Sequence, residues 1–294
     1  MNKRVLIIGG SGLLGKALLS VDEITEFSQV GFTSRKKRTS SKFCTFQLNI
    51  LDLQQVKKVV QNYEVIINCS GQLTVPISDC LDQNIIGINN LITAVKGSQK
   101  KLIQISSGNV YGTVHHLTEK SPLNPENSYA TAKSAADLLV LQSLKEKNYL
   151  IIRLSNLYGL GQQKGLISYL LHAIQNSSMV QFDDNNGSLT RFYLHADDAA
   201  AHILKLIQVN ASGIYNLFGP DKFSIREIIE LLSTKCNQSL TVKYAVQNPI
   251  GNIDQVDLSK LQTTIEITYQ HSLTTYLQQQ CKNLSEKSSH IKAS

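Results

Sequence analysis

Several features that would mark a membrane or secreted protein are missing from this sequence. No run of 18 apolar residues occurs among its 294 positions, so no helix of the usual length could span a bilayer. The opening stretch "MNKRVLIIGG" has four strongly apolar residues before two glycines, too few for the core of a signal peptide. Hydrophobic residues make up 42% and charged residues 17%, an ordinary globular composition. We therefore expect a cytoplasmic protein of one large or two smaller domains.

Cysteine is also scarce and carries no ligand pattern. The five cysteines are odd in number, scattered, and without a C-x-x-C spacing: Cys44, Cys69, Cys80, Cys236 and Cys281. Such a distribution is typical of reduced thiols and favours neither a disulfide framework nor a zinc site.

Positively charged residues outnumber negatively charged ones. Lys and Arg number 29 against 22 Asp and Glu, a formal net charge of +7. This balance suits nucleic acid, a membrane surface or an anionic small molecule. The densest basic run, residues 35–38, has no interleaved aromatic residue on which the bases of a single strand could stack. We expect a small-molecule substrate, no nucleic acid and no membrane partner.

Short apolar runs alternate with helical patterns through the first half of the chain. Strands are predicted at 4–8, 29–33, 44–48, 65–71, 101–107 and 150–155, and the clearest helices between them at 52–62, 78–97 and about 126–147. Asp52 is placed to cap the first of these helices. The alternation predicts an α/β fold, a Rossmann-type doubly wound parallel sheet covered on both faces.

The alternation loosens after about residue 160. Helices are predicted at 165–176 and 224–234, and a strand leading into a helix at 190–207. We expect a dinucleotide-binding domain over 1–160, to which some later segments return, a smaller substrate-binding lobe over 161–282, and a disordered polar tail over 283–294.

A glycine turn joins the first strand to the helix that follows it. Gly9, Gly12 and Gly15 form G-x-x-G-x-x-G, with Ser11 and Leu13 between them. A helix N-terminus presents free N–H groups and a positive dipole end, and side chains at these positions would keep a pyrophosphate away. The position after a strand and before a helix predicts a dinucleotide site.

The end of the second strand, "TSRKKR", has no carboxylate for a ribose 2′-hydroxyl, as an NAD site usually has. Ser34, Arg35 and Lys36 could instead hold a 2′-phosphate, since guanidinium suits phosphate geometry. The run favours NADP over NAD, with a solvated loop as the alternative.

Motifs in a fixed order resemble the extended short-chain dehydrogenase/reductase superfamily, the NAD-dependent epimerase/dehydratase family of nucleotide-sugar enzymes. They are "GGSGLLG", "NILD" (49–52), "NCSG" (68–71), "QNIIGINNLI" (83–92), "ISSGNVYG" (105–112), "YATAK" (129–133), "RLSNLYG" (153–159), "TRFYLHADDAA" (190–200), "GIYNLFG" (213–219) and "DLSKL" (257–261). The resemblance implies further cofactor contacts at Asn49, Ile50, Cys69, Ser70, Gly71 and Asn84. It also implies substrate contacts at Ser107, Gly108, Asn109, Asn156 and Arg191.

The resemblance implies a catalytic trio of Ser107, Tyr129 and Lys133. Tyr would exchange a proton with a sugar hydroxyl or ketone while hydride moves to or from nicotinamide. A free Tyr has a pKa near 10, and a cation one helical turn away stabilises phenolate. Lys133 could therefore lower the pKa of Tyr129 and also hold the nicotinamide ribose, and both residues would contact the cofactor. Ser107 would position the substrate oxygen.

The two residues directly after Ser107 limit which reactions of the family are possible. Related dehydratases carry Asp-Glu there, decarboxylases keep the Glu, and epimerase/reductases carry a Cys, whereas Gly108 and Asn109 cannot exchange protons. Two reactions of the family are then left: reduction of a 4-keto group, and C4 epimerisation through a transient ketone. The NADP signal favours a reductase acting on a nucleotide-activated deoxysugar. The alternatives are a C4-type epimerase with tightly bound NAD(P), or an idle NADP(H)-binding sensor or scaffold.

Two departures concern the diphosphate grip. Phe192 stands where an Asp usually follows the arginine, and no second arginine occurs in residues 247–256.

Metal ligation is not favoured by the remaining clusters. His115 and His116 are expected in a loop, Asp183 and Asp184 in a turn, and Asp198 at a helix start as a cap. The resemblance also implies a homodimer through the helices at 78–97 and 126–147.

Overall fold

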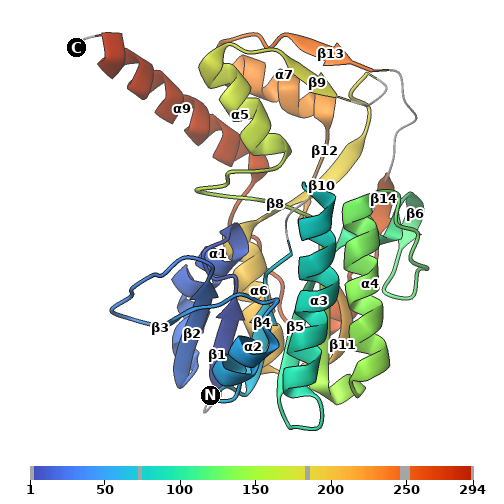
Figure 1. Cartoon of the computed structure of the whole chain (residues 1–294). Coiled ribbons are helices and arrows are strands. Elements are labelled where there is room, and N and C mark those ends of the chain that lie inside the picture. Colours follow the sequence, from blue (N-terminus) through green and yellow to red (C-terminus); the bar gives the residue numbers. More distant parts are fainter. Residues whose placement is uncertain (1–2, 72–74, 183–185, 246–251, 293–294) are drawn as a thin grey trace.

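A central sheet carries the fold. The computed structural model describes residues 3–71, 75–182, 186–245 and 252–292, and side chains as far as residue 286 (Figure 1). Seven parallel strands lie in the order β11-β7-β5-β4-β1-β2-β3. Their bounds are β1 Arg4–Ile8, β2 Gln29–Ser34, β3 Cys44–Gln47, β4 Val65–Asn68, β5 Lys101–Ser107, β7 Tyr149–Leu154 and β11 Gly213–Leu217. The order reverses beside β1, so the predicted Rossmann-type doubly wound sheet is confirmed.

Side chains of the strands alternate between two helical layers. In β1, Val5 and Ile7 belong to one hydrophobic cluster, and Leu6 and Ile8 to the other. The first cluster is covered by α1 Leu13–Ser20 and α6 Ala196–Gln208, and the second by α2 Leu53–Val60, α3 Ile77–Val95 and α4 Ser128–Ser143 (Figure 1). A sheet buried on both faces explains why its strands are continuous apolar runs.

Local signals set where these helices begin. The carboxylate of Asp52 accepts the N–H groups of Gln54 and Gln55, so its predicted capping role is confirmed. Asn127 caps α4 by accepting the N–H of Ala130 at 2.9 Å. Because each cap satisfies N–H groups that have no partner inside the helix, it fixes the first turn.

A second lobe is built beyond the sheet from the later half of the chain (Figure 1). Its core lies among α5 Leu166–Asn176, α7 Ile225–Cys236 and the first half of α9 Leu273–Lys292. Three small sheets, β12-β10-β8, β13-β9 and β14-β6, complete the structure. Their strands are β6 Val114–Leu117, β8 Asn156–Tyr158, β9 Val180–Phe182, β10 Thr190–His195, β12 Asp221–Ser224, β13 Val242–Tyr244 and β14 Ile253–Val256. The remaining elements are η1 Asp22–Glu26, η2 Gly108–Tyr111, η3 Glu146–Asn148 and α8 Ser259–Thr264. Strand β11 belongs to the large sheet, and helix α6 covers it, although both come from the later part of the chain.

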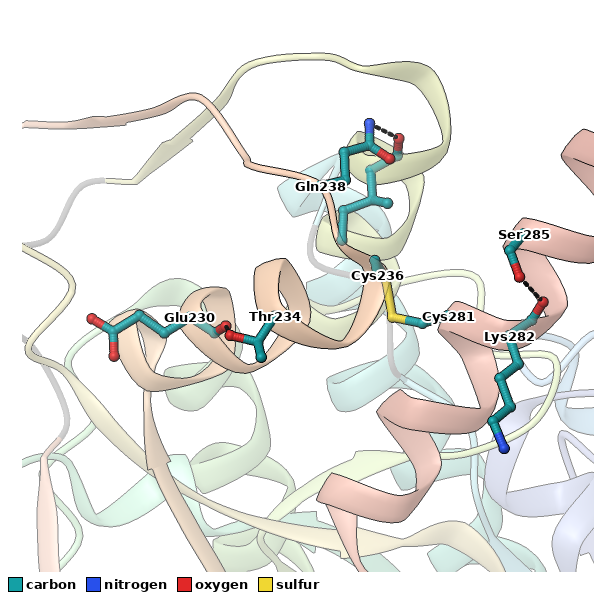
Figure 2. Close-up of a disulfide and its surroundings, with 8 residues drawn as sticks. Glu230, Thr234, Cys236, Gln238, Cys281, Lys282 and Ser285 are labelled. Atoms are coloured by element: carbon teal, nitrogen blue, oxygen red, sulfur yellow. Dashed lines mark hydrogen bonds between the residues drawn. A yellow bond between two sulfur atoms is a disulfide. The ribbon is translucent and has the colours of Figure 1, made fainter.

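A disulfide in the lobe corrects the expectation that all cysteines are reduced. Cys236 at the end of α7 and Cys281 in α9 are joined, with Cα atoms 4.8 Å apart (Figure 2). The two helices pack against each other, which brings together thiols 45 residues apart in sequence. The spacing of the cysteines along the chain did not predict this disulfide. Cys44, Cys69 and Cys80 are free.

Helix α9 also differs from the tail expected over 283–294, because it continues to Lys292. Its first half is anchored by Leu273, Leu277 and Cys281, all at most 4% exposed. Once a helix is anchored, each added residue costs little, so a polar segment can extend it. Among the described residues, no helix is both long and apolar enough to cross a membrane.

Candidate functional site

The parallel strands of the large sheet all end at one edge, which faces the second lobe (Figure 1). Ligands of open α/β sheets bind at this edge, beside the strand where the order reverses. Most of the residues singled out in the sequence follow β1, β2, β4 and β5 here.

The glycine turn brings the first strand and α1 into close contact. Gly9 has a φ of +80°, which favours glycine, and a Cβ on Gly15 would lie 2.5 Å from the carbonyl oxygen of Gly9. Gly12 is the N-cap of α1 and makes no side-chain cap bond. Ser11 and Gly12 are exposed and Leu13 is half-buried. The free N–H groups at this end of the helix are therefore available to a pyrophosphate.

A pocket lies where β2 and β3 end. Its lining consists of Arg35, Gln47, Leu48, Asn49 and Gln55. The described lining has one guanidinium and three amides and contains no carboxylate. Gln47, Leu48 and Gln55 were missed, because the polar pattern of a short strand gives no sign of which residue faces a ligand.

Other residues expected at this pocket lie beside it. The hydroxyl of Ser34 is buried and donates to the carbonyl oxygen of Lys36. Ile50 is 8% exposed, and its carbonyl accepts from Asn90. Neither Ser34, Lys36 nor Ile50 is part of the described lining.

The loop after β4 is held in place by a hydrogen bond from helix α3. Asn84 of α3, 2% exposed, donates its amide to the carbonyl oxygens of Gly71 at 3.1 Å and Cys80 at 2.9 Å. Ser70 is tied to Asn68 through both its N–H and its hydroxyl. The thiol of Cys69 is buried, which raises its pKa to about 12. Asn84 thus shapes the loop that would meet the cofactor, and its amide hydrogen bonds are made to the backbone.

The catalytic candidates lie on β5 and α4, two elements that pack against each other. Ser107 ends β5, and its hydroxyl accepts the N–H of Asn109 at 3.2 Å. Tyr129 lies half-buried in the first turn of α4. Lys133 is completely buried, and its ammonium donates to the carbonyl oxygens of Ser70 at 3.2 Å and Ile105 at 3.1 Å. An ammonium has three N–H donors, so these bonds leave one for a ligand.

Burial lowers the pKa of Lys133 to about 8, and the negative charge of Asp137 opposes that shift. Asp137 lies one helical turn further along α4 and is completely buried. It accepts hydrogen bonds from Ser106 at 2.9 Å and from Arg153 at 3.0 Å. Arg153 also donates to the hydroxyl of Tyr111 at 2.8 Å. This buried network joins the helix that carries Tyr129 to β5 and β7.

A second, small pocket of about 10 Å³ lies where β5 and β7 end, and its lining begins at Gly108, the residue after Ser107. It is lined by Gly108, Asn109, Leu154, Ser155, Asn156, Thr190, Arg191, Phe192, Phe218 and Ile253. The four non-catalytic substrate candidates from the sequence are all among them. None of the ten is an Asp, Glu, Cys or His, so the described lining offers no second group that could exchange a proton at neutral pH.

Arg191 and Asn156 are placed by neighbouring strands of the lobe. Arg191 in β10 donates to the carbonyl oxygen of Thr190 at 3.2 Å, and Asn156 in β8 donates to that of Phe192 at 3.3 Å. Residues 247–251, the first half of the stretch in which no second arginine occurs, lie outside the described residues. Phe192 and Phe218 were missed as lining residues, although a Phe in place of a usual Asp was a signal.

Two expectations about the remaining polar clusters are wrong. His115 lies in strand β6 rather than in a loop, since β6 pairs with β14, and its Nδ1 is 2.5 Å from a carboxylate oxygen of Asp254. Asp198 does not cap its own helix: its carboxylate accepts the N–H groups of Gln270 and His271. The pair 183–184 lies outside the described residues.

A group with metal-binding chemistry surrounds the start of α6. Donor atoms of His195, Asp197 and His271 lie within 4.8 Å of one another. The two imidazole rings are stacked, 3.8 Å apart and 14° from parallel, so their nitrogen lone pairs do not converge. The Nδ1 of His195 also accepts the N–H of Asp197, which uses the lone pair that a metal would need. The geometry of this group therefore does not suit a metal ion.

Known proteins are similar to this chain in sequence or in fold. UDP-glucuronic acid decarboxylase 1 of Danio rerio is 23% identical over 255 residues, which cover 79% of this chain and 60% of that protein, so the match leaves two fifths of the relative uncovered. UDP-glucose 4-epimerase of Lactobacillus helveticus is 26% identical over 263 residues, 77% of this chain and 80% of that protein. GDP-6-deoxy-D-mannose reductase of Pseudomonas aeruginosa is 28% identical over 205 residues, 63% and 66%.

Among solved structures, the dTDP-glucose 4,6-dehydratase of Bacillus anthracis in complex with NAD superposes with a TM-score of 0.84 at 20% identity, covering 97% of each chain. This likeness concerns the fold. The model of the NAD dependent epimerase/dehydratase family matches residues 5–217, most of the sheet and its helices. The chain therefore belongs to the NAD-dependent epimerase/dehydratase family, whose enzymes are of the extended short-chain dehydrogenase/reductase type.

Proposed function

We propose that the protein uses NADPH to reduce the 4-keto group of a nucleotide-activated deoxysugar. The observation that carries this proposal is the lining of the pocket beside Ser107. None of its described lining residues is an acid–base group, which leaves Tyr129 and Lys133 of α4 as the candidates for proton transfer. Elimination of water needs a second proton-exchanging group, whereas reduction needs one proton donor and a hydride.

The chain's residues fit a nicotinamide dinucleotide at the cradle formed by Gly9, Gly12 and Gly15, with Ser11 and Leu13 at the helix start. The loop of Cys69, Ser70 and Gly71 lies further along the same edge. Arg35 and Asn49 in the pocket after β2 support a 2′-phosphate, hence NADP rather than NAD. The reduced nicotinamide, when bound, supplies the hydride.

Each catalytic side chain then has one task. Ser107 donates a hydrogen bond to the sugar ketone and holds it in place. Tyr129 gives its proton to the oxygen as it becomes a hydroxyl. The buried ammonium of Lys133 stabilises the phenolate that remains, and its third N–H is free to hold the nicotinamide ribose. Asn156 and Arg191 are the candidates for the substrate's polar and diphosphate groups.

Incubation of the pure protein with NADPH or NADH and a panel of NDP-4-keto-6-deoxysugars tests the proposal by loss of absorbance of the reduced cofactor. We expect turnover with NADPH, faster than with NADH. Tyr129→Phe should abolish turnover and keep NADPH affinity. Interconversion of NDP-hexoses without added cofactor, with no oxidation of NADPH, would instead support a C4 epimerase. NADPH binding with neither activity would support a sensor or scaffold.

We also propose a homodimer through α3 and α4. Leu81, Ile86 and Leu138 on these helices are 41%, 46% and 46% exposed, a large apolar surface for three side chains of one helical layer. Sedimentation equilibrium should give a molecular mass of twice that of one chain, and the Ile86→Lys variant should have the mass of a single chain.

A further inference from the structure

Two buried histidines at helix α6 differ in how their ring nitrogens are satisfied. His202 is 1% exposed; its Nδ1 donates to the carbonyl oxygen of Asp198 at 2.6 Å, and its Nε2 accepts the N–H of Thr268 at 3.1 Å. His195, the N-cap of α6, is 7% exposed, and its Nδ1 accepts the N–H of Asp197 at 3.3 Å. Among the described residues, Nε2 of His195 has no hydrogen-bond partner. Most buried polar groups in proteins have a partner, so this nitrogen is available to a ligand.

The unpartnered nitrogen of His195 carries a hydrogen. Because Nδ1 accepts a hydrogen bond, the proton of the neutral ring lies on Nε2. Burial, and after it the charge of His271, lower the pKa of His195, so the ring is neutral at pH 7. The ring is also held in one orientation, since His271 stacks on it with centroids 3.8 Å apart and Tyr158 meets it edge to face at 5.2 Å. His195 therefore presents one fixed N–H donor.

This donor lies beside the start of α1. A Cβ on Gly159 would lie 3.5 Å from Nε2 of His195 and 3.6 Å from Cδ1 of Leu13. Gly159 follows β8, which pairs with β10, the strand that ends at His195. Leu13 is the first residue of α1, whose free N–H groups suit a pyrophosphate. The ends of β8 and β10 and the start of α1 therefore border one small space.

We propose that the Nε2–H of His195 donates a hydrogen bond to the pyrophosphate of the nicotinamide dinucleotide. This inference rests on the proposed function only in that a dinucleotide binds at the glycine turn. A pyrophosphate has two phosphate groups, so one can accept the N–H groups at the start of α1 while the other accepts from His195. Arg191, the candidate for the substrate's diphosphate, lies four positions earlier on β10, about 13 Å away along the strand, which places the two side chains at different ligands.

Two substitutions separate the donor from the helix cap. His195→Asn keeps an oxygen that can accept the N–H of Asp197 and removes the N–H at Nε2. His195→Gln places an amide N–H near the position of Nε2. His172→Gln, on the exposed surface of α5, is the matched control for loss of an imidazole.

We expect His195→Asn to bind NADP⁺ and NAD⁺ about 10- to 100-fold more weakly than the parent, because both share the pyrophosphate and a hydrogen bond to a charged group is lost. His195→Gln should recover most of that loss, and His172→Gln should bind like the parent. Isothermal titration calorimetry gives these affinities, and ³¹P NMR of bound NADP⁺ locates the contact. The pyrophosphate resonances should shift between the parent and His195→Asn, while the 2′-phosphate resonance should not.

Equal dinucleotide affinity in the parent and His195→Asn, or pyrophosphate resonances that stay in place, would overturn the inference. So would an equal loss in His195→Asn and His195→Gln. Because these measurements need no turnover, the two proposals fail separately. Affinity that depends on His195, without oxidation of NADPH by any keto sugar, refutes the reductase alone, and turnover with unchanged affinity in His195→Asn refutes the contact alone. If neither NADP⁺ nor NAD⁺ binds to the parent, both are wrong.

Discussion

Lys133→Met should make the protein inactive and, at neutral pH, more stable. The ammonium of Lys133 is completely buried, and burial lowers its pKa from 10.5 to about 8. At pH 7 the folded protein must keep a proton on this group in a site that disfavours the charge. Methionine is close in length and carries no charge, so it removes that cost together with the cation that we propose acts in catalysis.

The size of the effect follows from linkage. A shift from 10.5 to about 8 corresponds to about 3 kcal/mol of destabilisation, fully present below pH 8 and absent above about pH 10.5. The sign follows from the unfolded chain binding the proton more tightly, so the stability of the parent protein rises with pH across this window. The lost hydrogen bonds to the carbonyl oxygens of Ser70 and Ile105 offset about 1 kcal/mol each. The net gain at pH 7 is about 1 kcal/mol.

Urea unfolding of the parent and the variant at pH 7 and pH 10 provides the measurement. The stability difference, variant minus parent, should fall by about 2 to 3 kcal/mol between the two pH values, because groups common to both proteins cancel. Lys16→Met on the exposed face of α1 controls for the loss of a positive charge at the surface. A difference for Lys133→Met that does not change with pH would refute the placement of a strained, buried ammonium at this site.

Three further perturbations test the framework around the site. Asp137→Asn leaves the Arg153 guanidinium buried without its ion pair and should cost about 3 to 5 kcal/mol in urea unfolding, whereas the double variant with Arg153→Met should recover most of it. Cys281→Ser removes the disulfide to Cys236, which links residues 45 positions apart in sequence, and should lower the free energy of unfolding by about 4 kcal/mol without reductant. In dithiothreitol the variant and the parent should be equally stable. Arg35→Ser should raise the KM for NADPH at least tenfold and leave that for NADH unchanged; an equal rise for both would show that Arg35 does not contact a 2′-phosphate.

The features that the sequence predicts are those encoded by short stretches of the chain. A glycine triplet after an apolar strand, and helical periodicity after it, each involve fewer than twenty residues. Parallel strands then place their ends at one edge regardless of detail. That geometry alone brings Gly12, Ser107 and Tyr129 to the same edge, and the described structure has them there.

What the sequence did not predict depends on contacts between distant segments. Phe218 fills the space above Gly108 from 110 positions further along the chain, and Cys236 meets Cys281 through the packing of two helices. Asp198 lies at a helix start, where a cap is the local expectation, but its partners come from the segment before α9. No periodicity or spacing encodes such contacts, since they follow from how distant segments of the chain pack against one another.

The central claim is net hydride transfer from NADPH to carbon 4 of a sugar. It is tested most directly with NADPH deuterated at the transferred position of nicotinamide carbon 4 and an NDP-4-keto-6-deoxysugar, with the product examined by NMR and mass spectrometry. The account predicts one deuterium per product molecule, at carbon 4, and an equal amount of NADP⁺. An interconverted sugar without deuterium, and cofactor recovered in its reduced form, would contradict it.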